Sequence, residues 1–439
     1  MEEINDDQNN KEIIMRKVIV VVICATLCFL GMINVAGGQT TLRWLCWTLA
    51  EEPSGSVERA MVSEFEKDNP DIKIQLEPVP YPTMDVKFIT QSRAQQAPDI
   101  FRAYEAGVIR FAEMGLLLNL EPYIEKSGEK AFKDSFIDAL EPLVSYQGNW
   151  YGLVSWVVPQ DLVYNKDMFT KAGLNPNVPP ENWAEFLAYA KKLTKKDAAG
   201  NTVQWGFLIR GEKTDSTTLR LISFFYRNRA RILTEDYSKA ALNSPEGMDA
   251  FKRLVELYTK HHVIPPGIPE ATGHFINNMI AQEKAAMVQH GYNNIGIWEA
   301  MIPGMKDKLS IVHMPYDEID TTTGLASVMV ISSQCKHPEE AWKFITFIVN
   351  KKNQVRMFTE ANFLPTREDT LQMPEIQDCE AARFTIESVD KLTIYPHIAE
   401  WSEMSFSIIE AFHDATAEDK TPEEALNELA AKINDVLSK

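Results

Sequence analysis

Apolar and polar residues follow two different periods along residues 41–118, in the order strand, helix, strand. The first strand is expected at residues 41–47, where apolar side chains alternate around Trp44. A helix should follow, because apolar residues recur at helical spacing from Val57 to Phe65. The same order continues with strands at 72–76 and 97–101 and helices at 86–93 and 106–118. Such an alternation predicts the α/β class, with a parallel sheet covered by helices.

The second half of the chain repeats this alternation. Asn182 followed by Glu185 has the spacing of a capping box and predicts that a helix covers residues 183–195. Further strands are expected at 205–209, 285–288 and 327–332, and further helices at 245–261, 339–350 and from Thr421 onward.

The length of the chain calls for two lobes. A single hydrophobic core stops growing at about 250–300 residues, and this chain has 439. No Gly/Ser-rich linker is present, so the lobes should be joined by extended segments. We expect these crossings near residues 157–162, 312–323 and 363–367. One lobe would then contain residues 39–158 and 316–365, and the other would contain residues 162–311 and 366–439.

The N-terminal segment has the pattern of an export signal. Arg16 and Lys17 precede an apolar run over residues 18–33, which is followed by small residues. This run is shorter than the roughly 20 residues of a spanning helix, so we expect a signal peptide over residues 1–38, with translation from Met15. An uncleaved anchor is the alternative. A lipid anchor at Cys28 is disfavoured, because the bulky Leu27 precedes the cysteine.

Charge and cysteine content exclude several function classes. The net charge of −18 argues against nucleic acid or an anionic membrane as a partner. Outside the signal segment, Cys46, Cys335 and Cys379 permit at most one disulfide bridge. No metal or cofactor is expected, because the sequence contains no HExxH pattern, no GxSxG elbow and no phosphate-binding P-loop.

Several short segments follow one another in a characteristic order. They are residues 65–73, Ala97-Pro98-Asp99-Ile100, and residues 151–153, 164–169, 283–287, 291–292, 337–342 and 364–367. In this order they resemble family 1 extracellular solute-binding proteins, the maltose-binding type. Three positions depart from the family pattern. Arg229-Ala230 replaces a usual Gly-Gly pair, Arg102 takes the place of an aromatic residue, and Tyr292 takes the place of a tryptophan.

This resemblance implies a type II periplasmic-binding fold with a ligand cleft between two lobes. It further implies a monomer that closes on a carbohydrate without catalysing a reaction. The protein would deliver its ligand to the permease subunits of an ABC importer. It would act in the periplasm or at the extracellular face of the cytoplasmic membrane.

Ligands of open α/β lobes bind at the carboxyl ends of the strands. This rule selects the loops at 47–52, 101–105, 160–161 and 290–294, which combine aromatic, amide and carboxylate groups suited to a sugar. The candidate ligand-binding residues are Trp47, Glu51, Glu52, Arg102, Glu105, Trp156, Gln160, Asp161, Tyr292 and Asn293, to which the resemblance adds Trp401. A guanidinium group holds carboxylates in a bidentate manner. Arg102, with Arg210 or Arg227, therefore suggests the hypothesis of a uronate-bearing sugar.

Two other interpretations stay open at this stage. A hydrolase or lyase would need two carboxylates facing each other across the cleft, and Glu51 and Glu105 are the candidate pair. A binding protein for another solute, such as a polyamine, a peptide or a phosphodiester, is the nearer alternative. If a sugar is the ligand, replacing Trp47 or Trp401 by alanine should weaken its binding.

Overall fold

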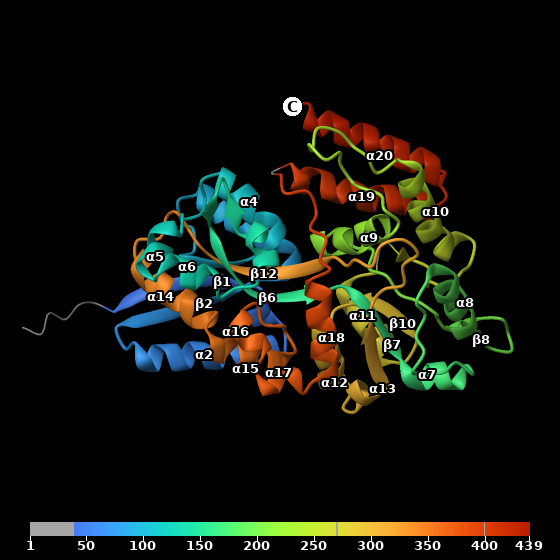
Figure 1. Cartoon of the computed structure of the whole chain (residues 1–439), viewed down its shortest axis with the longest axis horizontal. Coiled ribbons are helices and arrows are strands. Elements are labelled where there is room, and N and C mark those ends of the chain that lie inside the picture. The colour runs from blue at the N-terminus through green and yellow to red at the C-terminus, as the bar shows by residue number, and fades with distance from the viewer. Residues whose placement is uncertain (1–38, 269–270, 399) are drawn as a thin grey trace, which may run out of the picture.

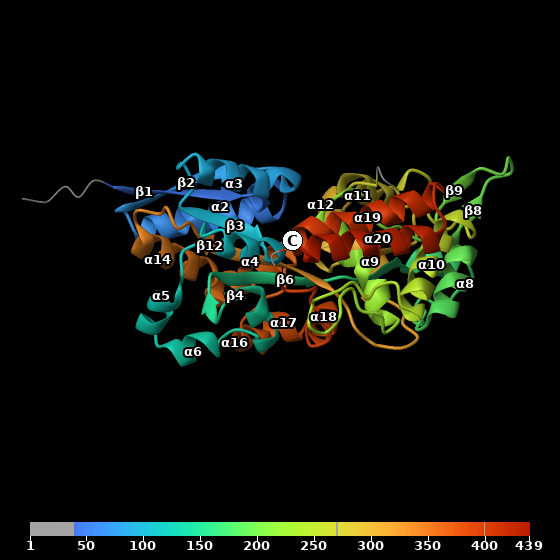
Figure 2. The same ribbon diagram turned by 90° about the horizontal axis from the view of Figure 1, so that it is seen from above.

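The computed structural model describes residues 39–268, 271–398 and 400–439 and places them in two lobes that lie side by side (Figure 1). The expected signal peptide lies outside these residues. The α/β class is confirmed, because each lobe contains a β-sheet accompanied by helices (Figure 2). No helix in the described part of the chain combines the length and the apolar character that crossing a membrane requires.

The first lobe is built on a five-stranded sheet in the order β2-β1-β3-β12-β6. Its strands are β1 (Thr40–Cys46), β2 (Ile72–Pro78), β3 (Ile100–Tyr104), β6 (Gly152–Pro159) and β12 (Gly324–Ile331). β1 pairs in parallel with β2 and β3, whereas β12 lies antiparallel between β3 and β6. The expectation of a purely parallel sheet is therefore wrong here. β12 enters from the second lobe, so it starts at the edge of the sheet where β6 ends.

Helices cover this sheet on both faces. They are α2 (Ser54–Asp68), α3 (Met84–Arg93), α4 (Glu105–Glu113), α5 (Glu121–Lys126), α6 (Glu129–Lys133), α14 (Pro338–Ile348) and α15 (Lys351–Ala361). The helix expected at 106–118 ends earlier, because Gly115 adopts a left-handed conformation with φ of +68°. Trp44 is fully buried in the core and meets Phe344 edge-on at 5.2 Å between ring centroids.

The second lobe contains a three-stranded sheet in the order β10-β7-β11. Its strands are β7 (Asp161–Asn165), β10 (Met287–His290) and β11 (Leu309–Val312), and β7 is antiparallel to both neighbours. The strand expected at 205–209 is not formed. Trp205 and Leu208 make only isolated bridges, to Ala285 and Val288 respectively. Between them, the Phe207 amide donates to the Val263 carbonyl at 3.1 Å and so leaves the ladder.

Most helices of the second lobe begin at side-chain caps, which the sequence partly predicts. The helices of this lobe include α8 (Trp183–Leu193), α9 (Asp215–Arg227), α10 (Pro245–Thr259), α11 (Gly273–Ala281), α12 (Asn293–Met301), α19 (Trp401–Thr416) and α20 (Pro422–Leu437). Of these, α12 and α19 have no side-chain cap. Thr421 and Glu424 form a reciprocal capping box at the start of α20. Asn182 caps α8, but the Glu185 carboxylate accepts from the Glu181 amide at 3.0 Å. The Glu185 side chain therefore bonds to the residue before the N-cap and not to the N-cap itself, as a regular capping box would require.

The chain passes directly from one sheet to the other at Gln160, the only residue between β6 and β7. A second passage runs beside it, because the Gln160 amide donates to the Thr323 carbonyl at 2.8 Å. The third predicted crossing fits the contacts less well. Leu364 and Arg367 pair with first-lobe residues, and residues 392–393 pair with Thr322. We therefore propose that residues 363–377 belong to the first lobe and that the third crossing lies near residues 390–395.

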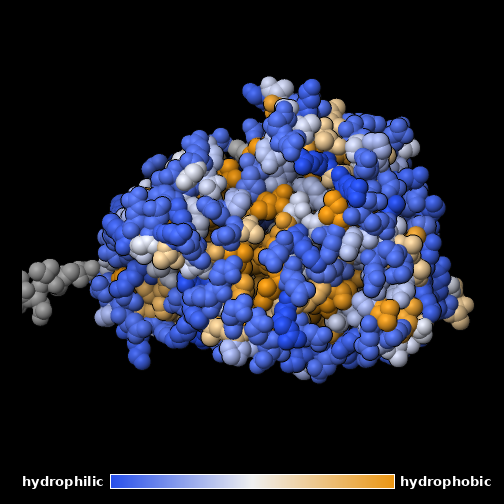
Figure 3. Space-filling model, viewed as in Figure 1, coloured by the Kyte–Doolittle hydropathy of each residue, from blue (hydrophilic) through white to orange (hydrophobic). Residues whose placement is uncertain are grey.

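The space between the lobes opens on the face shown in Figure 3. There, apolar residues gather in a central hollow between two largely hydrophilic lobes.

Candidate functional site

A cavity of about 760 Å³ lies between the lobes and takes side chains from both. From the first lobe it is lined by Trp47, Ala50, Glu51, Glu52, Pro80, Tyr81, Pro82, Tyr104, Trp156, Val158, Leu325 and Phe363, with Gln160 at the crossing. From the second lobe it is lined by Arg210, Glu212, Ser216, Arg220, Thr272, Gly273, His274, Asn277, His290, Asn293, Asn294 and Ile297. A ligand in this space touches both lobes at once. Its binding is therefore coupled to how the lobes sit against each other.

The first lobe supplies an aromatic wall. Trp47 follows β1 and stacks on Tyr104 at the end of β3, with ring centroids 5.2 Å apart and 19° between the planes. Trp156 on β6 meets Trp47 edge-on at 5.9 Å, and Tyr81 meets Tyr104 at 4.9 Å. The indole N–H groups of Trp47 and Trp156 are buried and have no hydrogen-bond partner among the described residues. A buried donor without a partner is costly, so both groups are free to serve a ligand.

Glu51 is a carboxylate on the same wall, with a pKa near neutrality. Burial raises the pKa of Glu51 to about 7, although the positive charge of Arg210 opposes this shift. The side chain is solvent-accessible by surface area, but that surface faces the cavity and protein surrounds it. The pKa shift and the accessibility are therefore compatible. Glu52 lies at the rim of the cavity, where it forms an ion pair with Arg59.

The Glu51 carboxyl group predicts a pH dependence of stability. Its pKa is about 7 in the folded state against 4.5 for an unperturbed glutamate, so the folded protein holds this proton more tightly. Its contribution to the free energy of unfolding is complete below about pH 4.5 and falls as the pH rises towards about 7. Glu51→Gln cannot ionise, so its melting temperature should rise relative to that of the parent protein from about pH 5 to about pH 8. A difference that stays constant over this range would contradict the shift.

The second lobe presents the N-termini of three helices to the cavity. Ser216 lies in the first turn of α9, Gly273 opens α11 and Asn293 opens α12, and all three residues line the cavity. Thr214 and Thr272 cap α9 and α11 through their side chains. Because the amide groups of a first helical turn carry partial positive charge, this wall favours hydroxyl oxygens and anions.

Six of the eleven sequence-predicted residues line this cavity. They are Trp47, Glu51, Glu52, Trp156, Gln160 and Asn293.

Arg102 and Glu105 do not line the cavity. Arg102 is buried within the first lobe, where its guanidinium forms an ion pair with Glu58 at 2.7 Å and donates to two serine hydroxyls. Its charge is already compensated, which removes its expected role towards an acidic sugar. Glu105 is also buried and accepts from the Ala326 amide at 2.8 Å. Burial raises the pKa of Glu105 to about 8.

Asp161, Tyr292 and Trp401 likewise lie outside the cavity lining. Asp161 is fully buried at the crossing, 3.7 Å from the ring of His313. Tyr292 lies beneath Phe358, and its hydroxyl is 3.3 Å from the thiol of Cys379. Trp401 is 2% exposed and therefore belongs to the core.

Tyr104 and His290 lie in loops that the strand-end rule selected, but they were not named as candidate ligand-binding residues. The sequence analysis did not select the remaining lining residues, which include Tyr81, Arg220, Thr272, Gly273, His274 and Asn277. The sequence could have indicated some of these residues. Thr214 and Thr272 are helix caps, and the rim of an α/β lobe contains helix N-termini as well as strand ends. Arg220 gave no such signal, since it lies within a helix that is buried on nearly every side.

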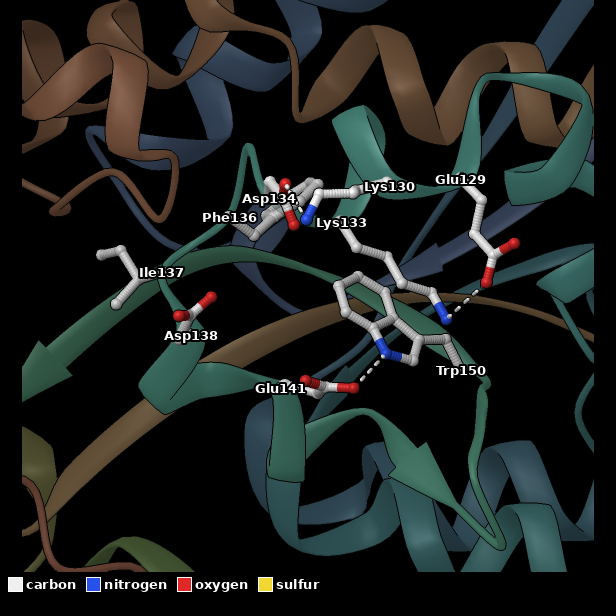
Figure 4. Close-up of a pocket in the computed structure, with 9 residues that line it drawn as sticks. All are labelled: Glu129, Lys130, Lys133, Asp134, Phe136, Ile137, Asp138, Glu141 and Trp150. Atoms are coloured by element: carbon white, nitrogen blue, oxygen red, sulfur yellow. Dashed lines mark hydrogen bonds and ion pairs between the residues drawn. The ribbon is translucent and has the colours of Figure 1, made fainter.

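A second hollow, of about 430 Å³, lies on the first lobe alone (Figure 4). The Trp150 indole N–H already donates to Glu141 at 3.1 Å. The Lys133 ammonium lies 3.9 Å from Glu129 and 2.9 Å from Glu121. Because the second lobe contributes none of its lining, this hollow is not coupled to lobe closure.

Comparison with known proteins places the chain in a family. The family model of bacterial extracellular solute-binding proteins matches residues 60–384, and the chain belongs to this family. An ABC-transporter solute-binding protein of Thermotoga lettingae, crystallised with α-D-tagatose, is 30% identical. The match covers 91% of this chain and 100% of that one, with a TM-score of 0.84. The resemblance deduced from the sequence motifs is confirmed.

Two further similarities extend this assignment. The arabinooligosaccharide-binding protein of Bacillus subtilis is 26% identical over 330 residues, which cover 72% of each chain. The maltose-bound MalE3 protein of T. maritima is 20% identical, covers 90% of this chain and all of its own, and has a TM-score of 0.80. At that identity the second similarity establishes the fold alone, and it is the maltose-binding fold that the sequence indicated.

Proposed function

We propose that this solute-binding protein captures a carbohydrate in the cavity between its lobes and delivers it to the permease of an ABC importer. The observation that carries the proposal is the composition of the cavity. One wall offers stacked aromatic rings with two unpartnered indole N–H groups, and the other offers amides, hydroxyls and helix N-termini. Sugars present flat apolar faces and many hydroxyls, which such a pair of walls complements.

Closure of the lobes would link binding to delivery. A ligand that contacts both walls only when the lobes are together shifts the population towards the closed form. Micromolar affinity corresponds to about −8 kcal/mol, which a few buried hydrogen bonds and two or three aromatic contacts can supply after the entropic cost of association. We propose that the permease recognises this closed form, that the protein acts as a monomer, and that it works outside the cytoplasmic membrane.

The relatives are binding proteins, and we propose that this protein also binds without catalysis. The candidate pair of catalytic carboxylates does not meet in the cavity, because Glu105 is buried within the first lobe and bonded to the Ala326 amide. Glu51 and Glu105 therefore do not form the carboxylate pair that a glycosidase needs.

A thermal-shift screen tests this proposal. A ligand that binds only the folded state raises the melting temperature by mass action. We expect at least one mono- or oligosaccharide to raise it in a dose-dependent manner, whereas spermidine, a tripeptide and a glycerophosphodiester should not. After incubation with the same oligosaccharides, the quantity of reducing ends should be unchanged. A shift produced only by one of the other solutes would overturn the assignment.

A further inference from the structure

One wall of the cavity contains a buried positive charge without a counter-ion. Arg220 on α9 is 0% exposed and lines the cavity. Its guanidinium donates to the carbonyls of Gln289 at 3.1 Å and Ser216 at 2.7 Å, and to His290 Nδ1 at 3.3 Å. All of these acceptors are neutral groups. Within the described part of the chain, no carboxylate lies within 4.0 Å of Arg220.

His290 does not supply the missing negative charge and does not add a positive one. Its Nδ1 also accepts from the Gly291 amide at 3.1 Å. Burial, together with the positive charge of Arg220, lowers the pKa of His290 well below its usual value. The imidazole is therefore neutral at physiological pH.

Three other arginines in the described part of the chain, the buried Arg102 and Arg227 and the partly buried Arg210, show what is missing at Arg220. Arg102, equally buried, pairs with Glu58 at 2.7 Å. Arg227 lies outside the cavity lining and has Asp161 and Asp320 near enough to support its charge. Arg210 lines the cavity and forms an ion pair with Glu212. An uncompensated buried charge costs several kcal/mol, so the cavity is electrostatically incomplete at Arg220.

Further groups strengthen this positive region. The Ser216 hydroxyl is shared by two guanidinium groups, since Arg210 donates to it at 3.2 Å and Arg220 also donates to it. Ser216 itself lies in the first turn of α9, where the helix dipole is positive. Asp215, the acidic residue of this turn, does not compensate either arginine. It forms no ion pair within 4.0 Å with them, and one of its oxygens accepts from Ser405 at 3.3 Å.

We infer that the ligand carries a carboxylate, as a uronic acid or a uronate-bearing oligosaccharide does, and that Arg220 and the Ser216 end of α9 receive it. This inference rests on the proposed carbohydrate-binding function. Four of the five N–H groups of Arg220 already donate within the protein, so one remains for a charge-assisted hydrogen bond to a carboxylate. The single uncompensated charge matches a monoanion better than a phosphate ester, which carries about −1.5 to −2 at neutral pH. The sugar ring would then stack on the opposite wall, on Trp47 and Tyr104.

Calorimetry with matched ligands tests the inference on the purified protein. The pairs are D-galacturonate with D-galactose and D-glucuronate with D-glucose, and a digalacturonate with its neutral disaccharide counterpart extends the comparison. D-glucose 6-phosphate provides the phosphate arm. We expect at least one uronate to bind 100-fold or more tightly than its neutral partner. Its affinity should fall as the salt concentration rises, since the contact pairs opposite charges.

Variants identify the residue responsible. Arg220→Gln should weaken uronate binding at least tenfold more than it weakens binding of the neutral partner. Arg220→Lys keeps the charge but loses the planar fork, so it should fall between. Arg231→Gln is the matched control, because Arg231 is exposed and lies outside this cavity, and it should bind as the parent does. If Arg220→Gln does not fold, the ligand pairs on the parent protein decide alone.

The outcomes separate this inference from the function on which it rests. Equal or tighter binding of the neutral sugars would overturn the inference and leave the proposed function intact. Binding of the sugar phosphate in preference to every uronate would overturn the carboxylate assignment. If none of the saccharides bound in this assay or in the thermal-shift screen, the proposed function would itself be rejected.

Discussion

Replacing Trp47 by alanine should weaken carbohydrate binding by tenfold to about 100-fold, which corresponds to about 1.4–2.8 kcal/mol. Trp47 is the centre of the aromatic wall, stacked on Tyr104 and in edge contact with Trp156. Its indole N–H is buried without a partner. The substitution removes both a stacking surface and a donor that a sugar hydroxyl can use. Isothermal titration with the sugar identified by thermal shift measures the loss.

Two further variants separate the possible causes of this loss of affinity. Trp47→Phe keeps an aromatic face but lacks the N–H, so its affinity should lie between those of the parent and Trp47→Ala. Trp401→Ala is the control for a large aromatic truncation elsewhere. Trp401 is buried against Tyr395 and lies outside the cavity lining. It should lower the free energy of unfolding by about 3–5 kcal/mol and leave binding by the folded protein unchanged. If Trp401→Ala impaired binding and Trp47→Ala did not, the position of the site would be wrong.

A large loss of stability is expected from breaking the ion pair between Arg102 and Glu58. The side chains are 1% and 0% exposed, and the charged atoms are 2.7 Å apart. Removing one partner leaves the other charge buried and uncompensated, which costs about 3–5 kcal/mol. We therefore expect Arg102→Met to reduce the free energy of unfolding by this amount in urea titration. Sugar affinity should be unchanged, because Arg102 does not line the cavity.

A double variant and a surface pair provide the controls. Arg102→Met combined with Glu58→Leu removes both charges and should recover much of the loss, since apolar replacements of a buried pair are often close to neutral. Lys126→Met breaks an ion pair with Glu339 whose side chains are 65% and 61% exposed, and it should cost less than about 1 kcal/mol. Equal effects of Arg102→Met and Lys126→Met would contradict the account of the buried pair.

The sequence predicted the elements of the fold better than their pairing. The strands expected around Trp44, at 72–76 and at 285–288 are present with shifted ends, because their apolar patterns are strong. The antiparallel entry of β12 could not be predicted. Its eight residues are buried except at the first position. Apolar and polar residues therefore do not alternate along β12, and the sequence pattern does not indicate how the strand pairs. The pairing of β12 depends on where the chain returns from the second lobe.

The candidate site was predictable where the chain ends a strand and less so inside the elements. Trp47 follows β1 directly, Glu51 follows the short helical turn Thr48–Ala50 after it, and both reach the cavity, as the strand-end rule predicts. The prediction that Arg102 binds the ligand failed. Every residue of β3 is buried, so the sequence does not reveal which face of the sheet each one occupies. Arg220 was missed for the same reason on a helix, since its neighbours on α9 are nearly all buried. Only the three-dimensional structure shows that Arg220 lines the cavity.

The central claim is that a carbohydrate binds between the two lobes, and a crystal structure of the protein with the sugar selected by thermal shift tests it most directly. The account predicts that the ligand lies against Trp47 and Tyr104 on one side and against Ser216 and Arg220 on the other, with both lobes in contact. A sugar bound instead in the hollow of the first lobe drawn in Figure 4, with the cavity between the lobes empty, would contradict it.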